Sequence, residues 1–339
     1  MKRPLTKVCM TLLCFCMAVA ACDSDALAAG GKLEILTSTF PIYQITRNVT
    51  KGWDSVNVSL MIPAQLGCPH DYALTPRDMR KLSKADVLII NGLGMEEFLG
   101  TPVKEANSKL KIMDSSIGIK DILNFTDVGE HEQARHKTEH EGEHRKEPAH
   151  EDRHAHEHEH PDHHHAGANP HLFASPRMVA LLAMNIAAGL SGIDPAGARI
   201  YSENARAYAE AMNRLADEFA ALGKQLANNR IVTQHGVFDY LARDMGLDVV
   251  AVVQAHAGQE PSASEMLAVV KTIRQEKAGA IFTEPQYPEK IGRTIAAETG
   301  IAAATLDPVA TGPEAAPLDY YETRMRQNHA IIGETLGTR

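Results

Sequence analysis

The stretch YSENARAYAEAMNRLADEFAALGKQL, residues 201–226, decides the fold. Its apolar side chains recur at alternating intervals of four and three residues, which places them in one stripe along a single helix. With the residues from Pro195 onward this helix reaches about 30 residues, or about 45 Å at the rise of an α-helix. A helix of that length can run along a protein with two lobes. The stripe consists of Tyr201, Ala205, Tyr208, Met212, Leu215, Phe219, Leu222 and Leu226.

On both sides of this helix, strand-like and helix-like segments alternate, which is the pattern of α/β units with parallel sheets. The clearest helix start has Thr75 as the cap, Pro76 at the first helical position and Asp78 at the positive end of the dipole. Another helix is expected from Pro176 to about Ser191. The predicted strands are 33–37, 56–62 and 87–90 before the long helix, and 231–233, 249–253, 280–283 and 302–306 after it.

The sequence therefore predicts an α/β protein in which two lobes with parallel sheets are joined by a single long rigid helix. The N-terminal lobe covers 32–192, the linker helix 193–229 and the C-terminal lobe 230–339. A net charge of −9 and a single Trp argue against a nucleic-acid partner, because such a partner requires a basic face and favours stacking aromatic side chains. We expect the protein to be a monomer.

Residues 1–21 have the pattern of an export signal. Three basic side chains precede an apolar run over 8–21, which at about 14 residues is too short to span a bilayer, so we expect an exported, periplasmic or otherwise extracytoplasmic protein. The run ends in a sequence that resembles a lipobox with Cys22 as the lipidated residue and membrane anchor, and cleavage near Ala28 is the alternative. Cys68 would then be the one unmodified cysteine left, which excludes an intramolecular disulfide.

A second break in composition covers 130–165, where three alanines are the only apolar side chains. This composition cannot form a core and indicates a solvated, disordered insertion in the first lobe. Imidazoles and carboxylates together bind cations such as Zn²⁺, Cu²⁺ and Ni²⁺ weakly, so the segment is predicted to collect metal, with a plain spacer as the alternative. It contains 12 of the 17 histidines: His131, His136, His140, His144, His150, His154, His156, His158, His160, His163, His164 and His165.

The same segment matches the metalloprotease motif H-E-x-x-H from His140, from His150 and from His156, and its inverted form from His136. Overlapping matches of this kind arise by chance in a sequence rich in His and Glu. A zincin site needs both histidines on one face of a buried helix, and this segment has no apolar face that could dock such a helix. The motif therefore does not predict a protease.

Three of the other histidines share a position in the predicted fold. His70 lies in the turn before the capped helix, His171 lies just before the next helix, and His235 directly follows a strand. Open α/β sheets place ligands at such carboxyl ends of strands, so these three side chains are candidate ligands. Three imidazoles with at most one carboxylate or water suit Zn²⁺, whereas Mn²⁺ favours more oxygen ligands. His256 and His329 lack this context, and no role is assigned to them.

The segments around the three histidines resemble a known family. They are PHDYALTP at 69–76, NPHLFASP at 169–176 and TQHGVFDYLARDMGL at 233–247, together with QEPS at 259–262, TEPQ at 283–286 and LDP at 306–308. These segments resemble the solute-binding proteins of zinc and manganese ABC importers, the cluster A-I group. The resemblance covers roughly residues 32–337, and the His-rich insertion looks like the zinc-specific branch.

The resemblance implies a metal site between the two lobes with His70, His171, His235 and Asp307 as ligands. It implies a protein that is not an enzyme, captures Zn²⁺ with high affinity and delivers it to a membrane permease driven by a cytoplasmic ATPase. In the manganese members the position of His235 holds a carboxylate, which favours zinc here. Asn169 departs from the usual aspartate of the family, which changes the support expected for His171.

Alternatives remain open at this point. Cu²⁺ or Ni²⁺ could bind as tightly as Zn²⁺, and a manganese- or other divalent-metal-binding protein of the same importer class is the alternative within the family. Zinc hydrolases also use three histidines with an open fourth position, and Glu284 is the one candidate base. A periplasmic metal store acting through the insertion is a third alternative. Cys68 lies two residues from His70 and is either a further ligand or a buried inert thiol.

Overall fold

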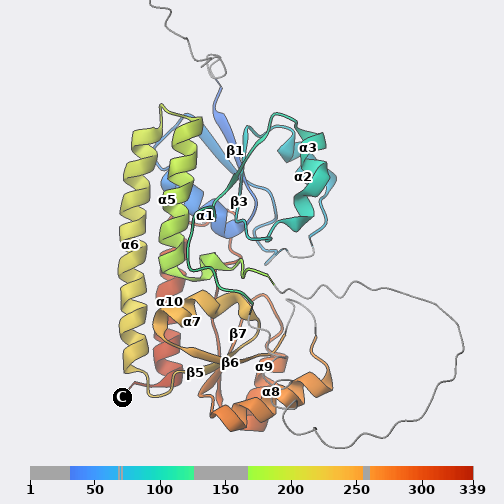
Figure 1. Cartoon of the computed structure of the whole chain (residues 1–339), viewed down its shortest axis with the longest axis vertical. Coiled ribbons are helices and arrows are strands. Elements are labelled where there is room, and N and C mark those ends of the chain that lie inside the picture. Colours follow the sequence, from blue (N-terminus) through green and yellow to red (C-terminus); the bar gives the residue numbers. More distant parts are fainter. Residues whose placement is uncertain (1–30, 68, 70–71, 126–166, 255–259, 339) are drawn as a thin grey trace, which may run out of the picture. The chain divides into compact units, whose positions relative to one another are not determined.

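Two four-stranded sheets, each made of parallel strands, form the framework of the protein (Figure 1). The order in the first sheet is β2 (Val56–Leu60), β1 (Leu33–Thr37), β3 (Val87–Ile90) and β4 (Lys111–Asp114). The order in the second sheet is β6 (Asp248–Val252), β5 (Arg230–Thr233), β7 (Ala280–Thr283) and β8 (Ala302–Thr305). The two sheets thus have the same strand order, in which the first strand lies between the second and the third. The prediction of an α/β fold with parallel sheets is confirmed.

The computed structural model describes residues 31–67, 69, 72–125, 167–254 and 260–338. The described residues from Leu33 onward belong to one compact unit. Several predictions lie outside the described residues, namely those for the export signal, Cys22, Cys68, His70, His256 and the His-rich insertion at 130–165.

Seven of the strands were predicted, with ends that differ by at most two residues, and β4 was not. The sequence of β4 is KIMD, and its first two side chains are exposed. Because β4 lies at the edge of its sheet, its side chains do not alternate between core and solvent as the pattern of a half-buried strand requires. Its place is instead fixed by pairing with β3 along four residues, from Val87 opposite Lys111 to Ile90 opposite Asp114.

The predicted helix cap is confirmed. The Thr75 hydroxyl accepts from the Asp78 N–H at 3.3 Å, and the Asp78 carboxylate accepts from the Thr75 N–H at 2.9 Å, which forms a capping box. The helices are α1 (Phe40–Val49), α2 (Pro76–Leu82), α3 (Gly100–Ala106), α5 (Pro176–Ile193), α6 (Ala198–Gln225), α7 (Asp239–Met245), α8 (Ala263–Glu276), α9 (Lys290–Thr299) and α10 (Tyr320–Leu336). Single 3₁₀ turns are η1 (Glu97–Leu99), η2 (Leu172–Ala174) and η3 (Gly236–Phe238).

The predicted long helix is α6, which has 28 residues and lies within the range 193–229. Its apolar stripe is buried at every predicted position except Tyr208, which is half-buried, and Leu226 caps its end. It runs beside α5 (Figure 1) and contacts α1 as well as α7 and α10. α1 follows a strand of the first sheet and α7 follows a strand of the second, so α6 packs against helices from both halves of the protein. The lobe boundaries at 192 and 230 stay a prediction.

Within the described part of the chain, α5 is the helix that is long and apolar enough to cross a membrane by length and composition. Half of that helix is buried inside the protein. Leu182, Ala183 and Ile186 lie on its buried face and belong to the main hydrophobic cluster. Core packing therefore accounts for its apolar composition.

One hydrophobic cluster includes residues from both sheets. It joins Ile35 and Ile89 of the first sheet, Ile231 and Phe282 of the second, and the stripe of α6. Two smaller clusters each lie within one lobe. The two lobes therefore share a core, and α6 lies along it.

The segment after β8 adds a second connection between the lobes. The Gly312 N–H donates to the Ala64 carbonyl at 3.0 Å, and the Arg47 guanidinium donates to the Ala316 carbonyl at 2.5 Å. A side chain at Gly312 would overlap the ring of Phe40 on α1, so only glycine permits this approach. In addition, the Tyr321 hydroxyl of α10 donates to the Phe173 carbonyl at 2.8 Å.

Gly223→Ala is expected to destabilise the protein. A Cβ at Gly223 would overlap the carbonyl oxygen of Met245, so α6 and α7 would have to separate. Overpacking costs about 1–3 kcal/mol, which exceeds the gain of about 1 kcal/mol in helix propensity from replacing glycine. Urea unfolding of the metal-free protein measures the net loss of unfolding free energy.

The matched control is Gly192→Ala in α5, where an added Cβ meets no atom within 4 Å. This variant should be as stable as the wild type or more stable, by up to about 1 kcal/mol. If both variants had the same stability, the close approach of α6 to α7 would not depend on glycine.

Candidate metal centre

The topology of the second sheet brings two loops together. β5 and β7 are neighbours, and the chain leaves β5 toward β6 on one side and β7 toward β8 on the other. The carboxyl ends of such a strand pair form the crevice in which open α/β sheets bind ligands. His235 lies two residues after β5, and Glu284 directly follows β7. The two side chains therefore meet at this crevice.

Glu284 orients the imidazole of His235. The Nδ1 atom of His235 makes a short hydrogen bond to the Glu284 carboxylate, and both side chains are buried. The other carboxylate oxygen accepts from the Gln286 amide at 2.6 Å, and the Glu284 N–H donates to the Gln234 side chain at 3.1 Å. A carboxylate only accepts, so Nδ1 of His235 carries the proton and the lone pair lies on Nε2.

Asn169 orients His171 in a similar way. Its Oδ1 atom accepts from Nδ1 of His171 at 2.8 Å and from the His171 backbone N–H at 3.0 Å. His171 is fully buried, and its ring centroid lies 5.1 Å from that of His235. The structure thus brings two predicted ligands into contact and places the lone pair of each ring on Nε2.

Aromatic rings surround the histidine pair. Phe125 and Phe173 each pack edge-on against His171 with ring centroids 5.8 Å away, and Tyr287 packs against His235 at 5.8 Å. Such a shell limits the access of water and lowers the local dielectric, which strengthens bonds between a metal and its ligands. The pair therefore lies in a setting suited to tight binding.

Asp307 follows β8, and its contacts are with its own lobe. Its Oδ1 atom accepts from the Val309 N–H at 2.8 Å, and its Oδ2 atom lies 3.7 Å from Nε of Arg324. Burial raises the pKa of Asp307, and the Val309 N–H and Arg324 partly offset this rise. In the described part of the chain, no group of three or more His, Cys, Asp or Glu side chains is placed to hold a metal. The roles of His70 and Asp307 stay predictions.

A buried carboxyl group after β3 is linked through Asn91 to the residue that precedes His171. Glu96 accepts from the Ser38 hydroxyl at 2.6 Å, the Asn91 N–H at 2.7 Å and the Gly92 N–H at 3.1 Å. Asn91 in turn donates to the Pro170 carbonyl at 2.9 Å, directly before His171. Burial raises the pKa of Glu96 to about 7 although these hydrogen bonds lower it. Ser38 and Asn91 directly follow the neighbouring strands β1 and β3, so this cluster lies at the carboxyl ends of a strand pair, as His235 and Glu284 do in the second sheet.

The sequence does not predict that Glu284, Glu96 and Asn91 support the histidine pair. From the sequence, Glu284 is a candidate catalytic base. Its position directly after a buried strand and two residues before Gln286 is the signal that could have indicated an orienting role. Glu96 and Asn91 gave no signal, because their partners lie up to 79 positions away along the chain. His329, which has no assigned role, packs edge-on against Phe219 with ring centroids 5.2 Å apart.

The family model for the zinc-uptake complex component A, periplasmic, ZnuA, matches residues 35–335. The chain belongs to this family. The resemblance drawn from the motifs around the three histidines is therefore confirmed. The family description names a component of an uptake complex, not a reaction, and its periplasmic location agrees with the predicted export.

Relatives of the chain include both short and long proteins. The zinc-binding protein AdcA of Streptococcus pyogenes serotype M3 is 28% identical over 94% of this chain, which spans 59% of the length of AdcA. The high-affinity zinc uptake system protein ZnuA of Bacillus subtilis is 28% identical over 87% of this chain and 85% of its own length. The chain thus corresponds to most of a ZnuA protein and about three fifths of AdcA.

Solved structures of the ZnuA fold superpose on most of this chain. A crystal structure of ZnuA has a TM-score of 0.68 at 25% identity and covers 90% of this chain and 100% of its own. FpvC of Pseudomonas aeruginosa in complex with Mn²⁺ has a TM-score of 0.70 at 25% identity and covers 90% and 98%. The fold with two parallel sheets and one long helix is therefore that of the ZnuA family.

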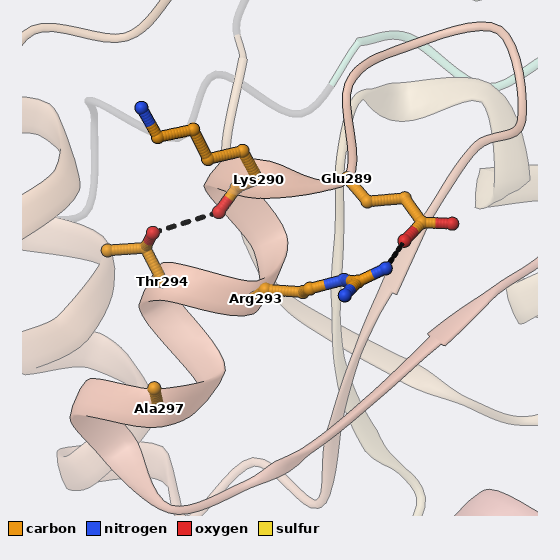
Figure 2. Close-up of a pocket in the computed structure, with 5 residues that line it drawn as sticks. All are labelled: Glu289, Lys290, Arg293, Thr294 and Ala297. Atoms are coloured by element: carbon orange, nitrogen blue, oxygen red, sulfur yellow. Dashed lines mark hydrogen bonds and ion pairs between the residues drawn. The ribbon is translucent and has the colours of Figure 1, made fainter.

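A surface depression lies on α9, and none of the predicted ZnuA-type site residues is among the residues that line it (Figure 2). Figure 2 shows the guanidinium of Arg293 paired with Glu289 and the Thr294 hydroxyl donating to the Lys290 carbonyl. The second of these is a hydrogen bond of 2.9 Å. Both interactions join residues one turn apart, and Ala297 completes the lining. The depression is thus the solvent face of a helix and not part of the candidate centre.

Glu96→Gln is expected to change how stability depends on pH. Because the folded-state pKa of about 7 lies above the ordinary 4.5, the folded protein binds this proton more tightly than the unfolded chain. The stabilisation is therefore complete below about pH 4.5 and is lost as the pH rises to about 7, by up to about 3 kcal/mol. Urea unfolding between about pH 5 and about pH 8 should show the wild type losing stability relative to the variant.

The control is Glu97→Gln, which changes the adjacent, exposed carboxylate. Its stability relative to the wild type should stay constant over the same pH range. A constant difference between the wild type and Glu96→Gln would contradict the raised pKa.

Proposed function

We propose that this protein captures Zn²⁺ outside the cytoplasm and delivers it to the permease of an ABC importer, which a cytoplasmic ATPase drives. The observation that carries the proposal is the buried pair of His171 and His235, whose Nδ1 atoms are both bonded to oxygen acceptors. Each ring therefore uses Nδ1 as a donor, so its neutral form carries the lone pair on Nε2, which is the form that binds zinc. The name of the family and the zinc-binding relatives support this assignment.

We propose His70 and Asp307 as the remaining ligands. Gly67, three residues before His70, lies against Gln286, since a Cβ added there would be 3.3 Å from the Gln286 side chain. Gln286 is bonded to Glu284, which holds His235, so the first lobe reaches the histidine pair just before His70. For Asp307, Oδ1 is bonded to a backbone N–H, and Oδ2 is the oxygen that we assign to the metal. Three imidazoles and one carboxylate suit tetrahedral Zn²⁺.

The choice of zinc over manganese follows from the donor set. Nitrogen-rich sites favour Zn²⁺, Ni²⁺ and Cu²⁺ over Mn²⁺, and His171 and His235 supply two nitrogens. The fold itself does not restrict the metal, because FpvC was solved with Mn²⁺. The selectivity therefore depends on these side chains, and a carrier of manganese or another divalent metal is the second candidate.

The hydrolase alternative is disfavoured by the contacts of Glu284. A general base must be within reach of a metal-bound water, whereas this carboxylate is fully buried and both its oxygens are bonded to protein groups, His235 and Gln286. Glu284 therefore fits the role of a residue that orients a ligand.

For the rest of the chain we propose the following organisation. Residues 1–21 form the export signal, Cys22 carries a lipid anchor, and the chain beyond it consists of the two lobes 32–192 and 230–339 with the linker 193–229. The relative in Streptococcus pneumoniae is called a zinc-binding lipoprotein, which supports the anchor. The histidines of 130–165 bind metal weakly and raise its concentration near the tight site.

Deletion of 130–165 is expected to leave one tight zinc site, and His235→Ala in the full chain is expected to abolish it. Competitive titration with Zn²⁺, Mn²⁺, Ni²⁺ and Cu²⁺ measures both affinity and stoichiometry. The structures of the family include a ZnuA deletion mutant with zinc bound, at 25% identity and a TM-score of 0.69, which shows that such an experiment is practicable.

His329→Ala is the control for the loss of a histidine, because His329 packs against Phe219. It should bind zinc like the wild type. If the deletion removed all tight binding, the protein would be a metal store acting through the insertion. If His235→Ala kept full affinity, the proposed site would be wrong.

Glu284→Gln is expected to weaken zinc binding by about 10- to 100-fold, the usual effect of removing the charge that supports a metal-bound histidine. The amide keeps the shape and can still accept from His235, so the fold should persist. The control is Glu298→Gln, whose carboxylate pairs with Arg274 at 2.9 Å on the surface. Equal affinities in the two variants would show that Glu284 does not act on the metal site.

A further inference from the structure

Asn169 makes hydrogen bonds with every polar atom it has. Its Oδ1 atom accepts from the ring and the backbone N–H of His171, and its Nδ2 atom donates to the Gly236 carbonyl at 2.7 Å and to Asp239 at 2.9 Å. Its backbone N–H donates to the Leu123 carbonyl at 2.7 Å. Its carbonyl accepts from the Tyr240 hydroxyl at 2.8 Å. The residue is fully buried.

The orientation of this amide follows from its partners. A backbone N–H can only donate, so the atom facing the His171 N–H must be oxygen. A carbonyl and a carboxylate can only accept, so the atom facing Gly236 and Asp239 must be nitrogen. The acceptor side of Asn169 is therefore turned to His171 and its donor side to the segment that follows His235.

These contacts cross from one lobe to the other. Ala168 pairs with Asn124 of the first lobe in an antiparallel bridge, so Asn169 approaches from that side. Gly236 and Asp239 follow β5 of the second sheet. A Cβ at Gly236 would lie 3.1 Å from the Asp239 carboxylate, so the two partners of the amide lie close together.

We propose that Asn169 is the positioning residue that joins the two halves of the metal site, and that an amide is required because Asp239 occupies its donor side. One side of the amide fixes the tautomer and angle of His171, and the other holds the turn that begins at His235. The spacing of the two imidazoles thus depends on a single side chain. This inference rests on the proposed function, since it concerns ligands of the same metal.

A carboxylate at this position would fail for two reasons. It has no hydrogen to donate, so Gly236 and Asp239 would each lose a partner in a buried setting. It would also place a second negative charge against Asp239, and two carboxylates in contact cannot both ionise readily. In this chain a carboxylate at position 169 therefore requires that position 239 no longer holds a carboxylate, and an amide there would also supply a donor.

The test compares Asn169→Asp with the exchanged pair Asn169→Asp/Asp239→Asn in the full chain, by competitive zinc titration. Asn169→Asp should weaken zinc binding by about 10- to 100-fold. The exchanged pair should recover most of the loss, because the amide introduced at position 239 can donate to the carboxylate introduced at position 169. A single variant that binds like the wild type, or an exchanged pair that folds but binds no better than the single variant, would overturn the proposal.

The matched control is Asn185→Asp. Asn185 also donates to two carbonyls, those of Ser115 at 2.9 Å and Ile117 at 3.0 Å, but lies on α5 away from the histidine pair. The Asn185→Asp variant should bind zinc like the wild type. This result would show that losing two donors weakens zinc binding only when the donors belong to the metal site. Circular dichroism and thermal unfolding establish that each variant folds.

A second measurement tests the inference on the wild type without metal. NMR of protein with ¹⁵N-labelled histidine should report a neutral His171 with its proton on Nδ1, and a proton on Nε2 would overturn the proposal even if Asn169→Asp does not fold. If the wild type bound no zinc tightly, the proposed function would fail, while the tautomer would still report on the role of Asn169.

Discussion

Burial of the apolar stripe of α6 is the constraint on which the rest of the structure depends. The stripe belongs to the cluster that also contains strands of both sheets, so neither lobe can turn away without exposing core side chains. Full burial of a single Leu or Phe is worth about 1.5–3 kcal/mol, and the stripe contains several. The contacts of Gly312 with Ala64 and of Tyr321 with Phe173 hold the lobes together at further points. Metal binding in such a molecule has to use side chains and loops more than a wide movement of the lobes.

With the lobes held in place, the site is built from the ends of strands. In both sheets the third strand in sequence lies beside the first, and polar residues follow both strands of each pair. Ser38 and Asn91 meet around Glu96 in the first lobe, and His235 meets Glu284 in the second. These buried polar groups are stable because they bond to one another. The bond to Glu284 sets the tautomer of His235, and the bond to Asn169 sets that of His171.

The residues differ in how well the sequence predicted them. The stripe from Tyr201 to Leu226 and the cap at Thr75 could be predicted because each depends on neighbours within a few positions. β4 could not, because its pairing with β3 and not its own pattern makes it a strand. Asn169 departs from the usual aspartate of the family, but its partner Asp239 lies 70 positions away, and nothing in the local sequence connects the two.

The sequence by itself determined the class of fold, the long helix and the kind of donor atoms available to a metal, because these follow from periodicity and residue type. Only the tertiary structure decided which atoms meet: that Glu284 supports His235 and that Asn169 joins His171 to the turn after His235. Those contacts depend on the parallel order of the strands and on a core shared by both lobes. The order of strands brings distant loops to one edge, and no local pattern encodes which side chain on one loop will face which side chain on the other.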